Sequence, residues 1–268
     1  MNKIFRLLAI LFLTSAIPAG FAAPLEKPYD HSPWDAFLKK FVNEKGEVNF
    51  AAVKKDPELL KAYLHQLRKV RQFDFLQWPR EEKIALWINA YHAAAVKTAV
   101  RHYPVKSLQE IPSAWETKLL KVGKSQYSLN QIRSEQLIEQ FHDEKIHFAL
   151  SCMAKSCPQL SRDAYTGPKL EGQLYEAVRK FINDPQKNSI DPEKKKVQVS
   201  KMFKWYGPDF RFNFGKPDNE KGLSKEEFSF LSFISYYLDD SAQGTFLQEG
   251  RYKIRYLPFD WSLNDWHS

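Results

Sequence analysis

The segment "WPREEKIALWINAYHAAAVKTAVRHYP", residues 78–104, has the most regular hydrophobic pattern in this chain of 268 residues. Its apolar residues recur at the i, i+3, i+4 and i+7 spacing of an amphipathic helix, at Ile84, Trp87, Ile88, Tyr91 and Ala95. Proline disfavours helical backbone in the residue before it, so the pattern predicts a long core helix that ends before Pro104. The small alanines 93–95 would let another backbone approach this helix closely.

Shorter elements are expected on both sides, without a repeat or a low-complexity linker. Two helices are expected near the amino terminus, with Ser32 as cap before Pro33 and Asp56 as cap before Pro57. The later expectations are a hairpin around Gly123, a helix at 128–141 capped by Ser128, a buried strand at 146–151, a helix at 166–184, a hairpin at 189–200, a helix at 224–240 with Ser224 and Glu227 in capping-box spacing, and a strand and turn at 252–265. These patterns predict one α+β domain of amphipathic helices packed on a small mixed or antiparallel sheet.

The first residues have the order of a secretory signal peptide, because two basic residues precede an uncharged apolar run. Gly20 and Ala22 supply small residues for cleavage after Ala22. A membrane anchor is less favoured, because the run is shorter than the roughly 20 residues that a span needs. We therefore expect a signal peptide at 1–22 and a periplasmic or secreted protein without a transmembrane anchor. Within it, we expect an amino-terminal helical extension at 23–80 and a core at 81–264.

The net charge of +8 favours acidic partners such as anionic lipid, polysaccharide or nucleic acid. Basic residues are nevertheless scattered along the chain, apart from one run, "PEKKKVQV" at 192–199, which reads as a solvated turn. We therefore expect no nucleic-acid partner. Aromatic residues make up 15% of the chain, which is enough for a sizeable core.

Both cysteines lie in "HFALSCMAKSCP", residues 147–158, and suggest a thiol nucleophile. Cys152 or Cys157 would be activated by His147 or His92, because a thiol needs a base or a positive field to ionise near neutral pH. The candidate orienting residues are Asn89, Glu82 and Asp260. Side chains alternate along a strand, so a strand at 146–151 would direct His147 and Cys152 to opposite faces and would favour Cys157 as its partner.

On the long helix, Glu82, Asn89 and His92 share a side distinct from the apolar stripe, and this side could line a cleft. The structural alternative is that Asn89 bonds a neighbouring loop while Glu82 is solvated in the first turn. Asp260, between two aromatic residues, could likewise be a catalytic acid, but a salt bridge or turn cap is favoured. The "KWYGPDF" segment, 204–210, is expected to pack Trp205 and Tyr206 in the core.

Other interpretations of the cysteine loop remain open. A Cys152–Cys157 disulfide would hold the loop beside a groove rich in Trp and Tyr, since exported proteins with two cysteines often join them. Zinc bound by His147, both cysteines and His92 satisfies ligand chemistry but matches no known spacing. A redox role is weaker, because the spacing is not C-x-x-C. We assign no cofactor, and the chain has no phosphate-loop, dinucleotide or serine-hydrolase motif.

Five segments together resemble the family called domain of unknown function 547, from Glu81 to Asn264. They are "EEKIALWINAYHAAAVKTAV", "YSLNQIRSEQL", "IHFALSCMAKSCPQLSRDAYTGPKLEGQL", "VSKMFKWYGPDF" and "YLPFDWSLN". The chain has His92 where similar sequences usually have asparagine, so the resemblance assigns His92 no shared role. The resemblance also extends to intracellular plant proteins, where stable disulfides are rare.

The resemblance implies no particular reaction, so function depends on the residues. The first hypothesis is a cysteine-centred hydrolase or acyl transferase, in which Cys157 or Cys152 attacks an acyl carbon, a histidine moves the proton and Asn89 orients or stabilises. The alternative is a non-enzymatic binding module for peptide or glycan with a local disulfide. Substrate and partner are not fixed by the sequence.

Overall fold

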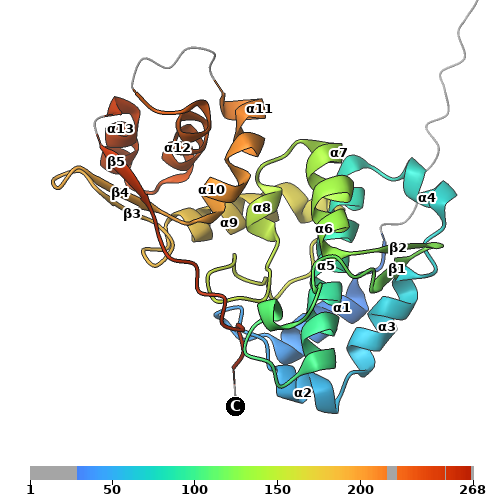
Figure 1. The fold of residues 1–268 in the computed structure, drawn as a ribbon. Helices are drawn as coiled ribbons and strands as arrows, with labels where there is room; N and C mark the ends of the chain where they lie inside the picture. The colour runs from blue at the N-terminus through green and yellow to red at the C-terminus, as the bar shows by residue number, and fades with distance from the viewer. Residues whose placement is uncertain (1–28, 216–221, 251, 267–268) are drawn as a thin grey trace, which may run out of the picture.

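Helix α5 (Arg80–His102) runs through the larger of two hydrophobic cores, and shorter helices surround it (Figure 1). The computed structural model describes residues 29–215, 222–250 and 252–266, and the expected signal peptide lies outside the described residues. Helix α5 ends before Pro104 and buries both the predicted apolar stripe and most of its other side chains. The prediction of a long core helix is confirmed.

The remaining elements are short. The α-helices are α1 (Ser32–Phe41), α2 (Phe50–Lys55), α3 (Glu58–Leu67), α4 (Gln72–Gln77), α6 (Leu129–Gln131), α7 (Glu139–Phe141), α8 (Ile146–Ala149), α9 (Leu170–Ile182), α10 (Met202–Tyr206), α11 (Arg211–Phe214), α12 (Lys225–Tyr237) and α13 (Ser241–Glu249). The 3-10 helices are η1 (Leu108–Glu110), η3 (Gly167–Lys169) and η4 (Gly207–Phe210), and η2 (Ile132–Ile138) is a π-helix between α6 and α7. The strands are β1 (Leu120–Val122), β2 (Ser125–Tyr127), β3 (Ser189–Asp191), β4 (Lys196–Val199) and β5 (Lys253–Tyr256). Among the described helices, none is both long and apolar enough to cross a membrane.

Two small sheets complete the α+β fold, which confirms the predicted class. Strands β1 and β2 form an antiparallel hairpin whose turn contains Gly123 at a φ of 55°, a conformation that glycine adopts without strain. In the second sheet β4 pairs antiparallel with β3 and parallel with β5. Both predicted hairpins are therefore present.

The predicted helix caps have two outcomes. Ser128 and Ser224 each form a complete capping box, as the sequence indicates. The caps expected at Ser32 and Asp56 are wrong, because α1 begins at Ser32 itself and α3 begins after Pro57. The Asp56 carboxylate instead forms an ion pair with Lys40 Nζ at 2.7 Å.

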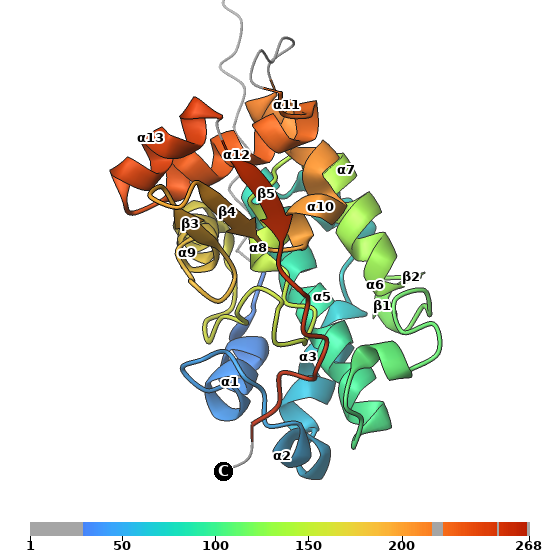
Figure 2. The same cartoon turned by 60° about the vertical axis from the view of Figure 1, so that its left-hand side comes forward.

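The two cores meet at α8 and α9, and the end of the chain crosses both. The second core contains the C-terminal half of α9, helices α10 to α13, the β3–β4–β5 sheet and Phe148 of α8. The first core contains the other buried apolar residues of these two helices, Ile146 and Ala149 of α8 and Leu170 and Leu174 of α9. After β5, a segment that we call the C-terminal strap, residues 257–266, descends from this sheet toward α1 and α2 (Figure 2). It bonds Val199 of the second core at one end and Val48 of the first at the other.

The buried strand expected at 146–151 is wrong, because residues 146–149 form the one-turn helix α8. Successive side chains of a helix differ in direction by about 100°, whereas a strand offers only two faces. The helical turn lets Phe148 and Ile146 enter different cores while His147 points elsewhere. The apolar composition that suggested a strand instead reflects burial in two cores.

Candidate functional site

A cleft of about 350 Å³ lies where the two cores meet. Its walls come from α5, the η1 region, α6 and η2, the α8 loop, α10 and the C-terminal strap. The lining residues are Tyr91, Gln109, Trp115, Glu116, Asn130, Arg133, His147, Leu150, Cys152, Pro158, Met202, Trp205, Tyr206, Phe259 and Trp261. Junctions between packed units are frequent positions of ligand sites, and this volume suits a small molecule or a short polymer segment.

Aromatic side chains form one continuous wall of this cleft. The ring of Trp205 lies 4.9 Å from Phe259 and 5.6 Å from Trp261, and Trp261 lies 5.9 Å from Trp115. Trp205 is 38% exposed, so the expectation that it packs in the core is wrong. Its apolar surface is instead shared between neighbouring rings and solvent, and the wall presents indole surface to anything that enters the cleft.

His147 of α8 forms the inner end of the cleft. Its ring stacks on Tyr206 at 4.3 Å, with 10° between the planes, and its Nε2 lies 2.9 Å from Asp209 Oδ2. Burial lowers the pKa of His147, while the Asp209 carboxylate opposes that shift. Asp209 is therefore a partner of His147. The Nδ1 atom is buried and has no partner among the described residues.

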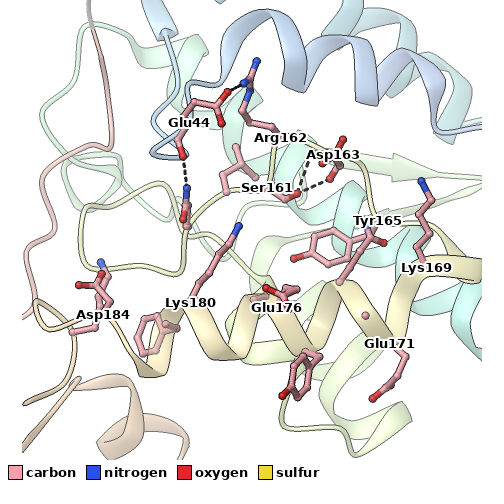
Figure 3. A pocket seen from close by; sticks show the side chains of 18 of the residues that line it. Glu44, Ser161, Arg162, Asp163, Tyr165, Lys169, Glu171, Glu176, Lys180 and Asp184 are labelled. Atoms are coloured by element: carbon pink, nitrogen blue, oxygen red, sulfur yellow. Dashed lines mark hydrogen bonds and ion pairs between the residues drawn. The ribbon is translucent and has the colours of Figure 1, made fainter. Parts of the chain in front are cut away.

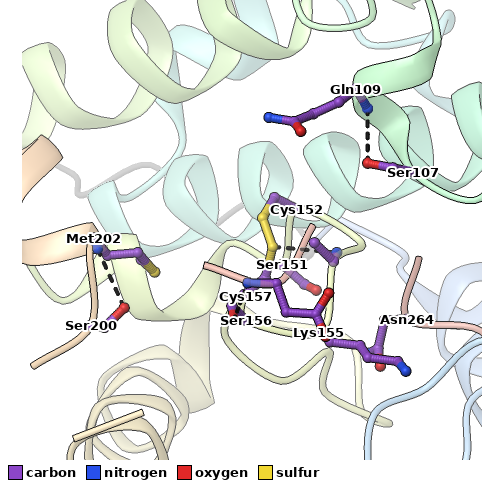
Figure 4. Close-up of a disulfide and its surroundings, with 12 residues drawn as sticks. Ser107, Gln109, Ser151, Cys152, Lys155, Ser156, Cys157, Ser200, Met202 and Asn264 are labelled. Atoms are coloured by element: carbon purple, nitrogen blue, oxygen red, sulfur yellow. Dashed lines mark hydrogen bonds between the residues drawn. A yellow bond between two sulfur atoms is a disulfide. The ribbon is translucent and has the colours of Figure 1, made fainter. Parts of the chain in front are cut away.

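Cys152 and Cys157 are joined by a disulfide, with 5.6 Å between their Cα atoms (Figure 4). Only Cys152 lines the cleft, and the described residues include no free cysteine. Neither sulfur atom is a nucleophile in this state, so the thiol hypothesis requires reduction of the disulfide. The structure has the disulfide that the alternative interpretation of the loop expects. The zinc alternative loses its two sulfur ligands, and no group of three or more His, Cys, Asp or Glu side chains suited to a metal occurs in the described parts of the chain.

The cysteine loop pairs with the C-terminal strap. The Lys155 and Ser156 backbone N–H groups donate to the carbonyls of Ser262 and Asp260, and Asn264 N–H donates to Met153. The Asp260 carboxylate accepts from Ser262 N–H at 2.9 Å, which is the turn cap favoured by the sequence rather than a role as an acid in the cleft. Through these bonds the disulfide loop fixes the strap residues that supply one side of the aromatic wall.

Glu82, Asn89 and His92 do share one side of α5, but none of them lines the cleft. They hold the chain that follows α8. Asn89 accepts a hydrogen bond from Tyr165 N–H at 3.0 Å and donates to Tyr165 O at 2.7 Å, and Ser151 N–H donates to His92 Nε2 at 3.1 Å. Asn89 therefore bonds a neighbouring loop, which is the structural role that the sequence analysis gave as the alternative to lining a cleft.

Glu82 holds the end of the same segment and is buried rather than solvated. Burial raises the pKa of its carboxyl group, and the nearby backbone N–H groups of Gly167 and Tyr29 oppose that rise. A Cβ atom at Gly167 would lie 2.4 Å from Glu82 Oε1, so a side chain at this position would displace the Glu82 carboxylate. The three α5 residues therefore position the backbone between 149 and 167.

A second hollow, of about 760 Å³, runs beside α9 (Figure 3). Several of its polar groups already bind one another: Arg162 forms an ion pair with Glu44, and Ser161 Oγ bonds the Asp163 backbone. Paired and exposed charges gain little from an incoming polar ligand. The aromatic cleft is therefore the stronger candidate site.

The thiol hypothesis missed most of the cleft. Arg133, Trp205, Tyr206 and Trp261 were not among the predicted site residues, although all four lie in the sequence segments that carry the family resemblance. Each of the five segments contributes at least one lining residue. The five segments could have been taken together as the candidate site, because they carry the family resemblance. Nothing in the sequence indicates, however, that they meet in space.

The fold and cleft define a helix-rich α+β protein with a ligand-sized aromatic site between two cores. Residues 75–182 match the family model described as protein of unknown function, DUF547, and this segment of the chain belongs to that family. The match begins six residues before the predicted start and leaves the α10 and strap segments outside it. No curated protein and no solved structure matches the chain.

Proposed function

We propose that the protein binds a glycan in the aromatic cleft. The observation that carries this proposal is the wall of Trp115, Trp205, Phe259 and Trp261, which faces a cleft with polar groups at its rim. Aromatic rings offer large apolar faces at low conformational cost. The C–H face of a sugar ring packs on such surfaces, and its hydroxyl groups need donors and acceptors. Gln109 and Asn130 supply amides for them.

A glycan is favoured over a peptide because the strap offers no free strand edge along the cysteine loop. Extended peptides usually bind by adding a strand, which needs unpaired backbone N–H and C=O groups. The strap carbonyls of Ser262 and Asp260 already accept bonds from the cysteine loop. Side chains therefore supply the recognition, as suits a ligand rich in hydroxyl groups.

Binding to neutral and acidic oligosaccharides, followed by tryptophan fluorescence and calorimetry, tests this proposal. Trp205→Ala and Trp261→Ala should each weaken binding by about tenfold or more, because buried aromatic anchors dominate binding energy. Phe73→Ala is the matched control, since Phe73 is 74% exposed on α4 and does not line the cleft. Unchanged affinity in both tryptophan variants, or no binding across the panel, would contradict the proposal.

A cysteine-centred hydrolase is the second candidate, because Cys152 and His147 line the same cleft and Asp209 can orient the imidazole. It requires the disulfide to open. Intact-mass measurement of alkylation, with and without reductant across a pH series, separates the two candidates. Rapid alkylation of reduced Cys152 well below pH 8.5 that is lost in His147→Gln would favour the hydrolase.

We propose also that the protein acts outside the cytoplasm. The signal-peptide pattern at 1–22 supports this, and a Cys152–Cys157 disulfide is the state expected in an oxidising compartment. The amino-terminal sequence of the protein isolated from its native cells is the test. A mature chain starting at Ala23 is expected, and an intact Met1 on all of the protein would contradict it.

A further inference from the structure

Arg133 is the only Lys or Arg among the described side chains that line the aromatic cleft. It lies on η2, whose buried Ile132 and Leu137 anchor the helix in the first core. Its guanidinium carbon is 5.0 Å from the centre of the Tyr206 ring. Stacking on an aromatic face fixes the guanidinium while leaving its N–H donors available.

The charge of Arg133 has no acidic counterpart within ion-pair distance among the described residues. Two acids at the site are bonded to other groups: Glu116, which lines the cleft, accepts from Asn130 Nδ2 at 3.2 Å, and Asp209 binds His147. This differs from the hollow beside α9, where Arg162 is paired with Glu44.

The positive field of Arg133 extends over the inner end of the cleft. Burial raises the pKa of both Tyr91 and Tyr206, and the charge of Arg133 opposes each rise. The same charge adds to the effect of burial in lowering the pKa of His147. Three lining residues from three elements thus experience one cation, which would attract an anion that enters the cleft.

We propose that the glycan is acidic and that a hexuronate carboxylate binds the Arg133 guanidinium. This inference rests on the proposed glycan function. A carboxylate is planar and matches the paired N–H donors of a guanidinium, and such charged pairs are the stronger hydrogen bonds. In a hexuronate the carboxylate is attached directly to the ring, so one residue can contact Arg133 while its ring packs on the tryptophan wall. The net charge of +8 also favours an acidic polymer.

Matched ligands test the charge separately from the sugar. Oligogalacturonate and alginate-type oligouronates are compared with their methyl esters, which keep the rings and lose the charge. The full chain with its disulfide intact should bind the acids about 10- to 100-fold more tightly than the esters, as expected for a charged hydrogen bond. The preference should weaken as salt is raised.

Arg133→Gln should abolish the preference for acids while retaining binding of the esters, and Arg133→Lys should restore it only in part because lysine lacks the planar pair of donors. Arg68→Gln removes the same charge from an exposed position outside the cleft and should leave the preference unchanged. Equal binding of acids and esters by the wild-type chain would overturn the acidic inference and leave glycan binding standing. A sulfated oligosaccharide that binds when uronates do not would overturn the carboxylate assignment. Binding of neither acids nor esters would overturn both proposals.

Discussion

His92 is a buried neutral side chain that holds the backbone after α8. Ser151 N–H donates to its Nε2 at 3.1 Å. Burial lowers its pKa from 6.5 to about 3. Between these two values the unfolded chain binds one proton more than the folded chain, so stability is lost as the pH falls below 6.5.

His92→Asn should therefore reduce the loss of stability in acid. The wild-type contribution amounts to about 2 kcal/mol between pH 8 and pH 5, and the variant should lack it whatever its stability at pH 8. Urea unfolding at a series of pH values measures the difference. The exposed His65→Asn serves as the control. If His92→Asn loses as much stability in acid as the wild type, the neutral buried state of His92 is wrong.

Asn89 makes the larger structural contribution on this side of α5. Asn89→Ala would leave both the N–H and the C=O of Tyr165 without a partner in the interior, which should cost about 2–4 kcal/mol of unfolding free energy. Gln126→Ala, at an exposed position of β2, should change stability by less than about 0.5 kcal/mol. Chemical denaturation distinguishes the two, and equal small effects would show that Tyr165 does not depend on Asn89.

At the scale of elements, the disulfide loop and the strap act together. A disulfide closing six residues stabilises the fold by only about 2 kcal/mol in the chain-entropy model. Its larger effect is local, because the loop bonds the strap that carries Phe259 and Trp261. The bridge therefore fixes the aromatic wall more than it fixes the whole chain.

The double variant Cys152→Ser, Cys157→Ser should remain folded but lose protection of strap amides in hydrogen exchange. Amides of α5 should exchange as in the wild type once the change in global stability is subtracted. Reduced wild-type protein, which retains both sulfur atoms, is the matched control and should resemble the variant. If neither the double variant nor reduction changes the hydrogen-exchange protection of the strap amides, the disulfide does not hold the aromatic wall in place.

At the scale of the whole molecule, α8, α9 and the strap couple the two cores. Phe148 contacts the second core, while its neighbours Ile146 and Ala149 belong to the first. Such shared elements make separate unfolding of either core costly, because each leaves apolar surface of α8 exposed.

Phe148→Ala should accordingly destabilise the entire chain by about 3–5 kcal/mol and retain one transition. Hydrogen exchange of α5 and α12, which lie in different cores, should accelerate by similar factors. Calorimetry gives the number of transitions. A variant in which α12 opens while α5 keeps its wild-type protection would show that the cores are independent. Phe212→Ala, with a side chain 70% exposed, is the control.

The sequence by itself determined the elements whose signals are local. The period of α5, the capping boxes at Ser128 and Ser224, and the turn at Gly123 each depend on residues a few positions apart, and all are present in the fold. The sequence gives a wrong prediction where the composition of a segment reflects tertiary packing. Residues 146–149 are mostly apolar because they face two cores, and their composition resembles that of a buried strand although they form a helix.

Only the tertiary structure decided the site. The cleft joins Arg133, His147 and Trp261, which are 128 positions apart at the extremes, and no local pattern encodes such a meeting. The sequence identified His147 and both cysteines as unusual and offered a disulfide as one alternative, but it could not assign Asp209 as the histidine's partner or decide between two free thiols and a disulfide. Those pairings depend on how α8, η4 and the strap pack, because hydrogen bonds and disulfides require atoms within a few ångströms of one another, and packing alone brings them there.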